Sequence, residues 1–463
     1  MNMKSMNKQV TFNILSSAII SGIGFLTTPI FTRILGTVQY GKYSVFYSWV
    51  TIITCLMGMQ TQTSIVTGYY DYKESYFSFR SGILLVGTII SSVFIALSLF
   101  FSVPLANWLG YTIPIFVMLL LSSFFHYVID FARMSLIYEK KAVLNFIIST
   151  SLSLITVFVS LLLLDNFGED ERFLSRVYGL TVPYCVIGIA VYIIIYLKKP
   201  SMPKLEYWKY SLGFGVPMVF HALSGKILGQ ADCIMLEKMG DISESVGLYS
   251  FYHTYTSILT VILTALNTSW LPFFFDDLSE NSTKQLKIKT KHYLELFTLI
   301  CIVYLLISRE VSYIFADSSY FKGLDLIPIF TLTIYYTFMY QFSVNYEIFR
   351  KKTGIIAIGT FGAAILNIIL NALFIPVLDM YGAAIATTLS YLGLFIAHYY
   401  ISKKLQDGKP YVTMRDFANW FFLIAITCIL FYVMKDMVII RWVIAIMIGI
   451  LCLVRVFKRR SIF

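Results

Sequence analysis

Long apolar stretches run through this chain, and short polar segments separate them. A helix that crosses a bilayer core of about 30 Å needs about 20 mostly apolar residues, because each residue adds about 1.5 Å. Fourteen stretches of this kind are found, at residues 10–32, 43–67, 80–103, 111–135, 143–164, 174–197, 211–234, 246–271, 291–315, 325–348, 355–377, 381–402, 414–434 and 438–457. The pattern therefore predicts an all-α integral membrane protein with about fourteen transmembrane helices.

The composition supports the same class. Of 463 residues, 58% are hydrophobic and 13% are charged, whereas about a quarter of the residues of a soluble domain are charged. The six cysteines include no CxxC pair, so the sequence indicates neither disulfides nor a metal site. The first apolar stretch is too long for a signal-peptide core and is expected to remain as the first helix.

Basic residues indicate the orientation, because Lys and Arg that flank membrane helices are retained on the cytoplasmic side. With the N-terminus inside, basic runs fall on the cytoplasmic side, and the outer loops lean acidic. The basic runs are "LKKPSMPK" (197–204), "TKQLKIKTK" (283–291), "RKK" (350–352) and "FKRR" (457–460). Topology thus explains the net charge of +11, no nucleic-acid partner is expected, and both termini are predicted to be cytoplasmic.

One loop comes close to a nucleotide-binding motif. The stretch "GTVQYGKYS" (36–44) has Gly36, Gly41 and Lys42 at the spacing of a phosphate-binding loop. Tyr43, however, stands where that loop carries Ser or Thr, and the stretch follows an apolar helix instead of a strand. These features argue against an ATPase. The glycines are expected instead to permit a tight outer turn between the first two helices.

Short patterns of the first half return in the second half. "YGKYS" (40–44) returns as "VGLYS" (246–250), and "VYGLT" (177–181) returns as "MYGAA" (380–384). The offsets are 206 and 203 residues, and every copy precedes a helix on the same predicted face. The nearly equal offsets indicate an internal duplication.

We therefore predict two six-helix lobes, residues 1–205 and 206–408, followed by two additional helices and a basic cytoplasmic tail in residues 409–463. An even number of helices returns each lobe to the side where it began, so the lobes would be parallel repeats. Transporters built from such repeats bind their substrates at the repeat interface near the middle of the membrane. The organisation is typical of a transporter.

Several stretches carry a resemblance to a known family. They are "TPIFTRILGTVQYGKYS" (28–44), "GFGVPMVFHALSG" (213–225) with the following "ADCIMLEKMG" and "VGLYS", and "YGAAIAT" (381–387). The chain resembles the polysaccharide transporter branch of the multidrug/oligosaccharidyl-lipid/polysaccharide (MOP) exporter superfamily, and within it the Wzx-type flippases of O-antigen or capsule repeat units. The resemblance implies a MATE-like fold with two six-helix lobes around a central cavity. Many members look twelve-helical, so the last two helices depart from the family pattern.

The resemblance also implies a function. Such a protein would flip undecaprenyl-diphosphate-linked oligosaccharide from the cytoplasmic to the outer leaflet of a bacterial inner or plasma membrane by alternating access. The implied partners are this lipid-linked substrate, the bilayer, a polysaccharide polymerase and a chain-length regulator. No enzymatic activity and no cofactor are expected. An H⁺ or Na⁺ gradient or the membrane potential would drive transport.

Charges inside the hydrocarbon layer are costly and tend to mark a transport pathway. Lys226 lies deep in the predicted helix at 211–234, where it could offer a fixed cation to a lipid diphosphate. His221 and Asp232, five and six positions away, are further candidates for the substrate cavity, although they lie on other faces of a regular helix. A structural ion pair with another helix is the alternative role for Lys226.

A polar stripe is predicted on the fourth helix. In "HYVIDFAR", His126, Asp130 and Arg133 follow at spacings of four and three, so they share one helix face near the cytoplasmic end. The alternative is an interfacial pair between Asp130 and Arg133. The resemblance adds Arg33, in "TRILG", as a candidate for the outer half of the cavity, with interfacial snorkelling as its alternative.

Two other classes compete with the flippase. A cation-coupled drug or small-molecule antiporter of the same superfamily would need buried carboxylates in the N-terminal half, where the sequence offers Asp130 beside Arg133. A sugar polymerase would be expected to carry a large outer loop, and the predicted outer loops are short. No carboxylate pair, metal cluster or nucleophile triad stands out in an extramembrane segment, so the sequence favours a flippase for an anionic substrate.

Overall fold

The computed structural model describes residues 3–240, 244–280 and 282–459, and within these residues it contains helices and short connections without any strand. Contacts divide the chain into two compact units, Met1–Glu237 and Lys238–Phe463, which we call the first and the second unit. The predicted boundaries at residues 205 and 408 rest on the sequence repeat, and they stay a prediction.

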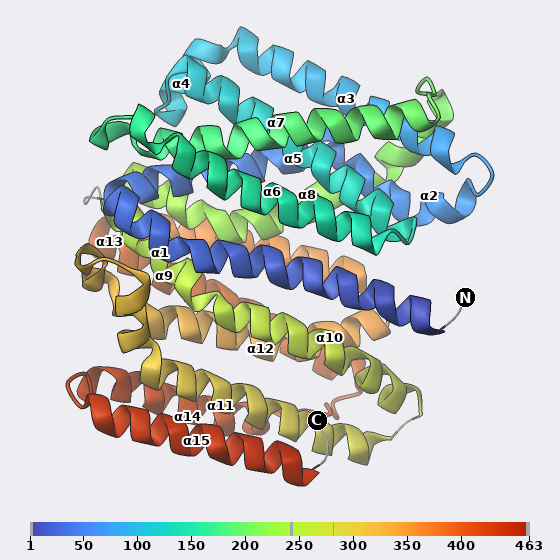
Figure 1. Cartoon of the computed structure of the whole chain (residues 1–463). Helices are drawn as coiled ribbons and strands as arrows, with labels where there is room; N and C mark the ends of the chain where they lie inside the picture. Colours follow the sequence, from blue (N-terminus) through green and yellow to red (C-terminus); the bar gives the residue numbers. More distant parts are fainter. Residues whose placement is uncertain (1–2, 241–243, 281, 460–463) are drawn as a thin grey trace. The chain divides into compact units, whose positions relative to one another are not determined.

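The first unit contains nearly all of eight α-helices (Figure 1). Its elements are α1 (Met3–Leu56), the 3-10 helix η1 (Met57–Ser64), α2 (Ile65–Asp71), α3 (Tyr76–Phe100), α4 (Ser102–Leu109), α5 (Ile113–Tyr138), α6 (Ala142–Leu162), η2 (Leu164–Asn166), η3 (Glu169–Glu171), α7 (Phe173–Lys198) and α8 (Leu205–Met239). The last two residues of α8 lie past the boundary between the units.

The second unit contains the remaining helices. Its elements are α9 (Ser245–Thr256), α10 (Ile258–Ser279), α11 (Thr283–Phe315), η4 (Ser318–Gly323), α12 (Leu326–Phe349), α13 (Thr353–Leu405), α14 (Met414–Val433) and α15 (Val438–Arg459).

Two of the long elements are pairs of helices joined at one residue. α1 bends at Gly36, and α13 bends at Asp379, where φ is +50°. α9 and α10 form one apolar segment, and α2 and α4 are short. If α1 and α13 count as two helices each, α9 and α10 count as one, and the short α2 and α4 are left out, the described residues contain fourteen long helices. This confirms the predicted class and helix number. Nine helical segments in those residues are long and apolar enough to cross a membrane by length and composition.

The bend in α1 accounts for the first glycine of "GTVQYGKYS". Gly36 has φ of +66°, a backbone conformation that residues with a Cβ rarely adopt. Gly41 lies in the helix that follows and is buried there. The tight turn expected at this stretch is therefore present, and Gly36 makes it. In the second half, residues 241–243 before "VGLYS" lie outside the described residues, so a matching turn there stays a prediction.

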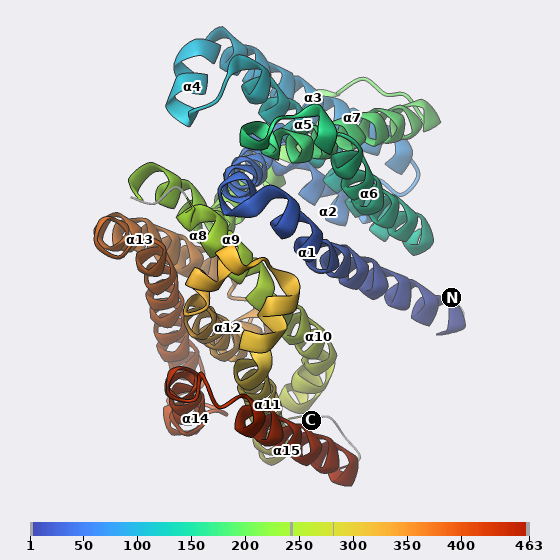
Figure 2. The ribbon, with the colours of Figure 1, turned by 60° about the vertical axis from the view of Figure 1, so that its left-hand side comes forward.

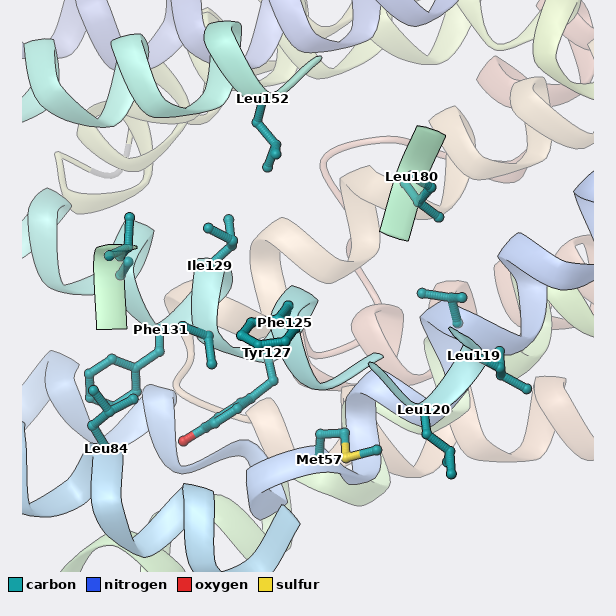
Figure 3. Close-up of a cluster of buried hydrophobic side chains, with 14 of the residues drawn as sticks. Met57, Leu84, Leu119, Leu120, Phe125, Tyr127, Ile129, Phe131, Leu152 and Leu180 are labelled. Atoms are coloured by element: carbon teal, nitrogen blue, oxygen red, sulfur yellow. The ribbon is translucent and has the colours of Figure 1, made fainter. Parts of the chain in front are cut away.

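The core of the first unit is centred on α5. Figure 3 shows its Tyr127 close to Met57 of η1. Tyr127 is fully buried, and its hydroxyl lies 2.8 Å from the Thr61 hydroxyl. Two glycines make room for this ring: a Cβ at Gly58 would lie 2.3 Å from it, and a Cβ at Gly87 would lie 1.7 Å from its hydroxyl. The tight packing holds one face of α5 and leaves its opposite face available for polar residues.

In the second unit, α14 and α15 pack against α11 (Figure 2). Arg441 of α15 is buried, pairs with Glu310 of α11 and donates to the Leu306 carbonyl at 3.0 Å. Nearer the other end of α15, Arg455 pairs with Glu295 of α11. These two ion pairs lie far apart along α11 and attach the last helix to it.

Candidate substrate site

The polar stripe of α5 lies on one face, as its spacing predicts. Arg133 Nη1 lies 3.8 Å from Asp130 Oδ1, and these side chains are 33% and 51% exposed. His126, one turn earlier, has its Nδ1 2.7 Å from the Ser122 carbonyl oxygen, so Nδ1 is placed to donate. A loose ion pair that remains accessible can exchange its partner for a ligand, because exposed pairs contribute at most about 1 kcal/mol to stability.

Aromatic rings surround this stripe. The His126 ring stacks on Tyr184 of α7, with the ring centroids 3.7 Å apart. Tyr47 of α1 meets His126 edge-on at 6.4 Å, and Tyr43 stacks on Tyr47 at 6.3 Å. The Tyr47 side chain remains 39% exposed. The rings therefore offer an aromatic surface next to the charged groups of α5.

Arg176 of α7 supplies a second cation, which sequence reasoning missed. Its guanidinium lies over the rings of Phe31, at 3.8 Å, and Tyr43, at 4.4 Å. Its Nε is buried without a hydrogen-bond partner. Arg176 and Asp130 both act electrostatically on the Tyr47 hydroxyl, so the two charges lie near the same ring. Arg176 belongs to the same group as the α5 stripe.

Lys226 of α8 is exposed and lies near this group. Its charge acts on the Asp130 carboxylate and on the His126 ring. One turn further along α8, the Gln230 side chain accepts a hydrogen bond of 2.9 Å from the Ser48 hydroxyl of α1. This contact turns the Lys226 face of α8 toward α1. Lys226 and the α5 stripe were predicted separately, and in the structure the Lys226 charge acts on two members of the stripe.

The other candidate residues lie elsewhere on their helices. Arg33 is exposed and precedes the bend of α1. His221 is exposed on α8, whereas Asp232 is 2% exposed. On a helix with about 100° per residue, neither of the latter two shares the face of Lys226. The assignment of Arg33, His221 and Asp232 to a substrate site stays a prediction.

We call Asp130, Arg133, Arg176 and Lys226, with the rings of His126, Tyr43, Tyr47 and Tyr184, the α5 cluster. It contains three cations and one carboxylate, so its net charge favours an anionic ligand. Two of the cations are guanidinium groups, which can bind phosphate oxygens with two parallel hydrogen bonds. Within the described residues, no group of three or more His, Cys, Asp or Glu side chains is placed to hold a metal ion.

Comparison with known proteins identifies the class of this chain. Residues 6–277 match the family described as polysaccharide biosynthesis protein, which is more than half of the chain, so the protein belongs to this family. A membrane protein of Haemophilus influenzae is 24% identical over 408 residues, which cover 84% of this chain and 94% of the relative. The predicted family is confirmed, and the chain is a multi-pass membrane protein.

Solved structures agree on the fold. The lipid II flippase MurJ in its inward closed conformation matches 97% of this chain and 99% of its own with a TM-score of 0.75, at 15% identity. An inward-facing MATE-family multidrug transporter of the MOP superfamily matches 87% of this chain and 96% of its own with a TM-score of 0.60, at 14% identity. The predicted MATE-like fold is confirmed. The protein is thus a member of the polysaccharide biosynthesis protein family with a MurJ- and MATE-like fold.

Proposed function

We propose that this protein flips undecaprenyl-diphosphate-linked oligosaccharide repeat units from the cytoplasmic to the outer leaflet of a bacterial inner or plasma membrane. The product would serve O-antigen, capsule or other surface polysaccharide assembly, with a polysaccharide polymerase and a chain-length regulator as partners. The observation that carries the proposal is the α5 cluster, a half-exposed group of cations and aromatic rings in a protein of this family.

The cluster matches the two parts of such a headgroup. Arg133 and Arg176 can bind diphosphate oxygens through paired hydrogen bonds, and Lys226 adds a point charge. Tyr47, which is 39% exposed, offers a ring on which the first sugar can pack. Asp130 pairs only loosely with Arg133, at 3.8 Å, so the guanidinium can turn to the ligand, while the carboxylate repels the anionic headgroup. The polyprenyl tail would stay in the lipid.

The membrane potential can drive this movement without ATP. An inside-negative potential favours outward movement of a negative headgroup. For a charge near −2 the gain is about 4 to 5 kcal/mol per 100 mV, because each charge contributes about 2.3 kcal/mol. Alternating access, in which the site opens first to the cytoplasm and then to the outside, would complete the cycle. A cation-coupled drug antiporter is less consistent with the cluster, because Asp130 lies beside Arg133 and near Lys226.

Lys226 provides the test in cells. In a strain that lacks its own copy of this gene, Lys226→Ala should abolish surface polysaccharide at normal protein levels in the membrane. Lys226→Arg should keep part of it, because the positive charge is retained. Lys209→Ala, which removes an exposed lysine near the beginning of the same helix, is the matched control and should behave as wild type. Full surface polysaccharide with Lys226→Ala would remove Lys226 from the site.

A further inference from the structure

A second group of cations and hydroxyls lies in the second unit, where α11 and α14 begin. Lys287, Thr290 and Lys291 of α11, together with Thr413 and Asp416 at the start of α14, line a cavity of about 150 Å³. This volume has room for one tetrahedral oxyanion together with waters.

Thr290 points to a ligand in this cavity. The residue is 1% exposed, it lines the cavity, and its hydroxyl has no hydrogen-bond partner. A buried helical threonine usually donates to the carbonyl one turn earlier, as Thr298 of the same helix does to Leu294 at 2.6 Å. Because buried hydroxyls are nearly always satisfied, the unused donor of Thr290 suggests that something else accepts its hydrogen bond.

The charges around the cavity favour an anion. Lys287 and Lys291 lie one turn apart on α11, so they flank the same space. Asp416 is engaged by the capping box of α14: it accepts from the Thr413 amide at 3.1 Å and from the Thr413 hydroxyl at 2.7 Å. Lys291 Nζ lies 3.8 Å from Asp416 Oδ1, whereas Lys287 has no carboxylate within ion-pair distance among the described residues. The N-terminus of the 20-residue helix α14 adds its partial positive charge.

The position along α11 fits a membrane interface. α11 has 33 residues and is about 50 Å long, longer than a bilayer core of about 30 Å. Its first turns, which carry both lysines, can therefore extend past the hydrocarbon to the depth of lipid phosphates. The basic run of which they are part is predicted to face the cytoplasm.

We propose that this cavity binds a phosphate monoester or inorganic phosphate. Lys287 and Lys291 neutralise the charge, Thr290 donates to one oxygen, and the ligand holds α14 against α11. The phosphate could come from an anionic lipid headgroup or from solution. The proposal is independent of the flippase function, because it concerns a different group of residues and a different ligand.

Two probes separate the sources of phosphate. The purified full-length protein is placed in nanodiscs of phosphatidylcholine, with or without phosphatidic acid, and its melting temperature is measured. In parallel, binding of radiolabelled inorganic phosphate is measured by equilibrium dialysis in phosphatidylcholine nanodiscs. Stabilisation by phosphatidic acid alone identifies a lipid headgroup, saturable binding of inorganic phosphate alone identifies free phosphate, and both together identify a site for the phosphate group itself.

Variants decide whether the cavity is responsible. Lys287→Gln with Lys291→Gln should weaken binding by roughly tenfold or more, and Thr290→Val should weaken it several-fold, because each removes a charged or direct hydrogen bond. Thr290→Val without ligand should melt at or above the wild-type temperature, since it replaces an unsatisfied buried hydroxyl with a methyl group. Lys284→Gln, an exposed lysine of α11 that does not line the cavity, is the control. Binding of neither probe, or unchanged binding in the Lys287/Lys291 and Thr290 variants, would overturn the proposal.

Discussion

The α5 cluster of the first unit and two ion pairs of the second unit differ in how firmly their charges are held. In the second unit, His398 and Glu347 are both fully buried, and the imidazole Nδ1 lies 2.8 and 2.9 Å from the two carboxylate oxygens. Arg441 is 1% exposed and binds Glu310 as well as two backbone carbonyls. In the α5 cluster of the first unit, by contrast, Asp130 and Arg133 are partly exposed and 3.8 Å apart.

This contrast separates structural charge from functional charge. A buried pair whose hydrogen bonds are made is fixed, and removing one partner leaves a charge without compensation. A half-exposed, loosely paired group contributes little to stability and can bind a ligand instead. The number of intramembrane charges is therefore a poor guide to function, whereas their accessibility is informative.

The largest effect on stability is expected at Glu310. Glu310→Ala leaves the Arg441 guanidinium buried without its carboxylate and should lower the free energy of unfolding by about 3 to 5 kcal/mol. The measurement is thermal or denaturant unfolding of the purified protein in detergent. Glu169→Ala, at an exposed pair with Arg172, is the control and should change stability by less than about 1 kcal/mol. Equal effects of the two substitutions would remove the contrast.

A smaller loss of stability is expected at Glu347. Glu347→Gln keeps an acceptor for His398 but removes the charge from a fully buried pair, so the free energy of unfolding should fall by about 1 to 3 kcal/mol. Gly359 packs against the other side of the imidazole, where a Cβ would lie 2.1 Å from His398 Nε2, so the ring has little room to find a new partner. A variant that unfolds as the wild type does would show that this pair is not a structural one.

The smallest effect on stability, and a clear effect on binding, is expected at Asp130. Asp130→Asn should change the free energy of unfolding by less than about 1 kcal/mol, because the side chain is half-exposed and loosely paired. The same substitution should tighten binding of undecaprenyl diphosphate by several-fold, because a nearby negative charge no longer repels it. Competition binding to the purified protein measures this, and weaker binding would contradict the assigned role.

The sequence predicted the helices well and the site only in part. Apolar runs locate the segments inside the bilayer. The first turns of α8 and α11, before residues 211 and 291, are polar, so the hydropathy pattern does not predict that they are helical. Those turns carry Lys287 and the tyrosines near the start of α8. Gly36 was recognised as a turn residue because its surroundings excluded a phosphate loop.

The site residues that were missed share a physical reason. Arg176 stands near the start of a predicted helix, where an arginine usually anchors the helix at the interface. Tyr47 and Tyr184 are two of 33 tyrosines in a chain with 17% aromatics, so neither stands out. The i, i+4 spacing of Tyr43 and Tyr47 was a usable signal for one ring face. The meeting of Lys226 with the α5 stripe depends on how α8 packs, which no pattern within one helix reveals.

Direct measurement of flipping tests the central claim. The wild-type protein and a variant carrying Arg133→Gln, Arg176→Gln and Lys226→Gln are reconstituted in liposomes with undecaprenyl-diphosphate-linked oligosaccharide, and appearance of the sugar in the opposite leaflet is followed. The account predicts that the wild type exceeds protein-free vesicles, while the folded triple variant falls to their rate. Flipping by the triple variant at the wild-type rate, or none by the wild type under an imposed potential, would contradict it.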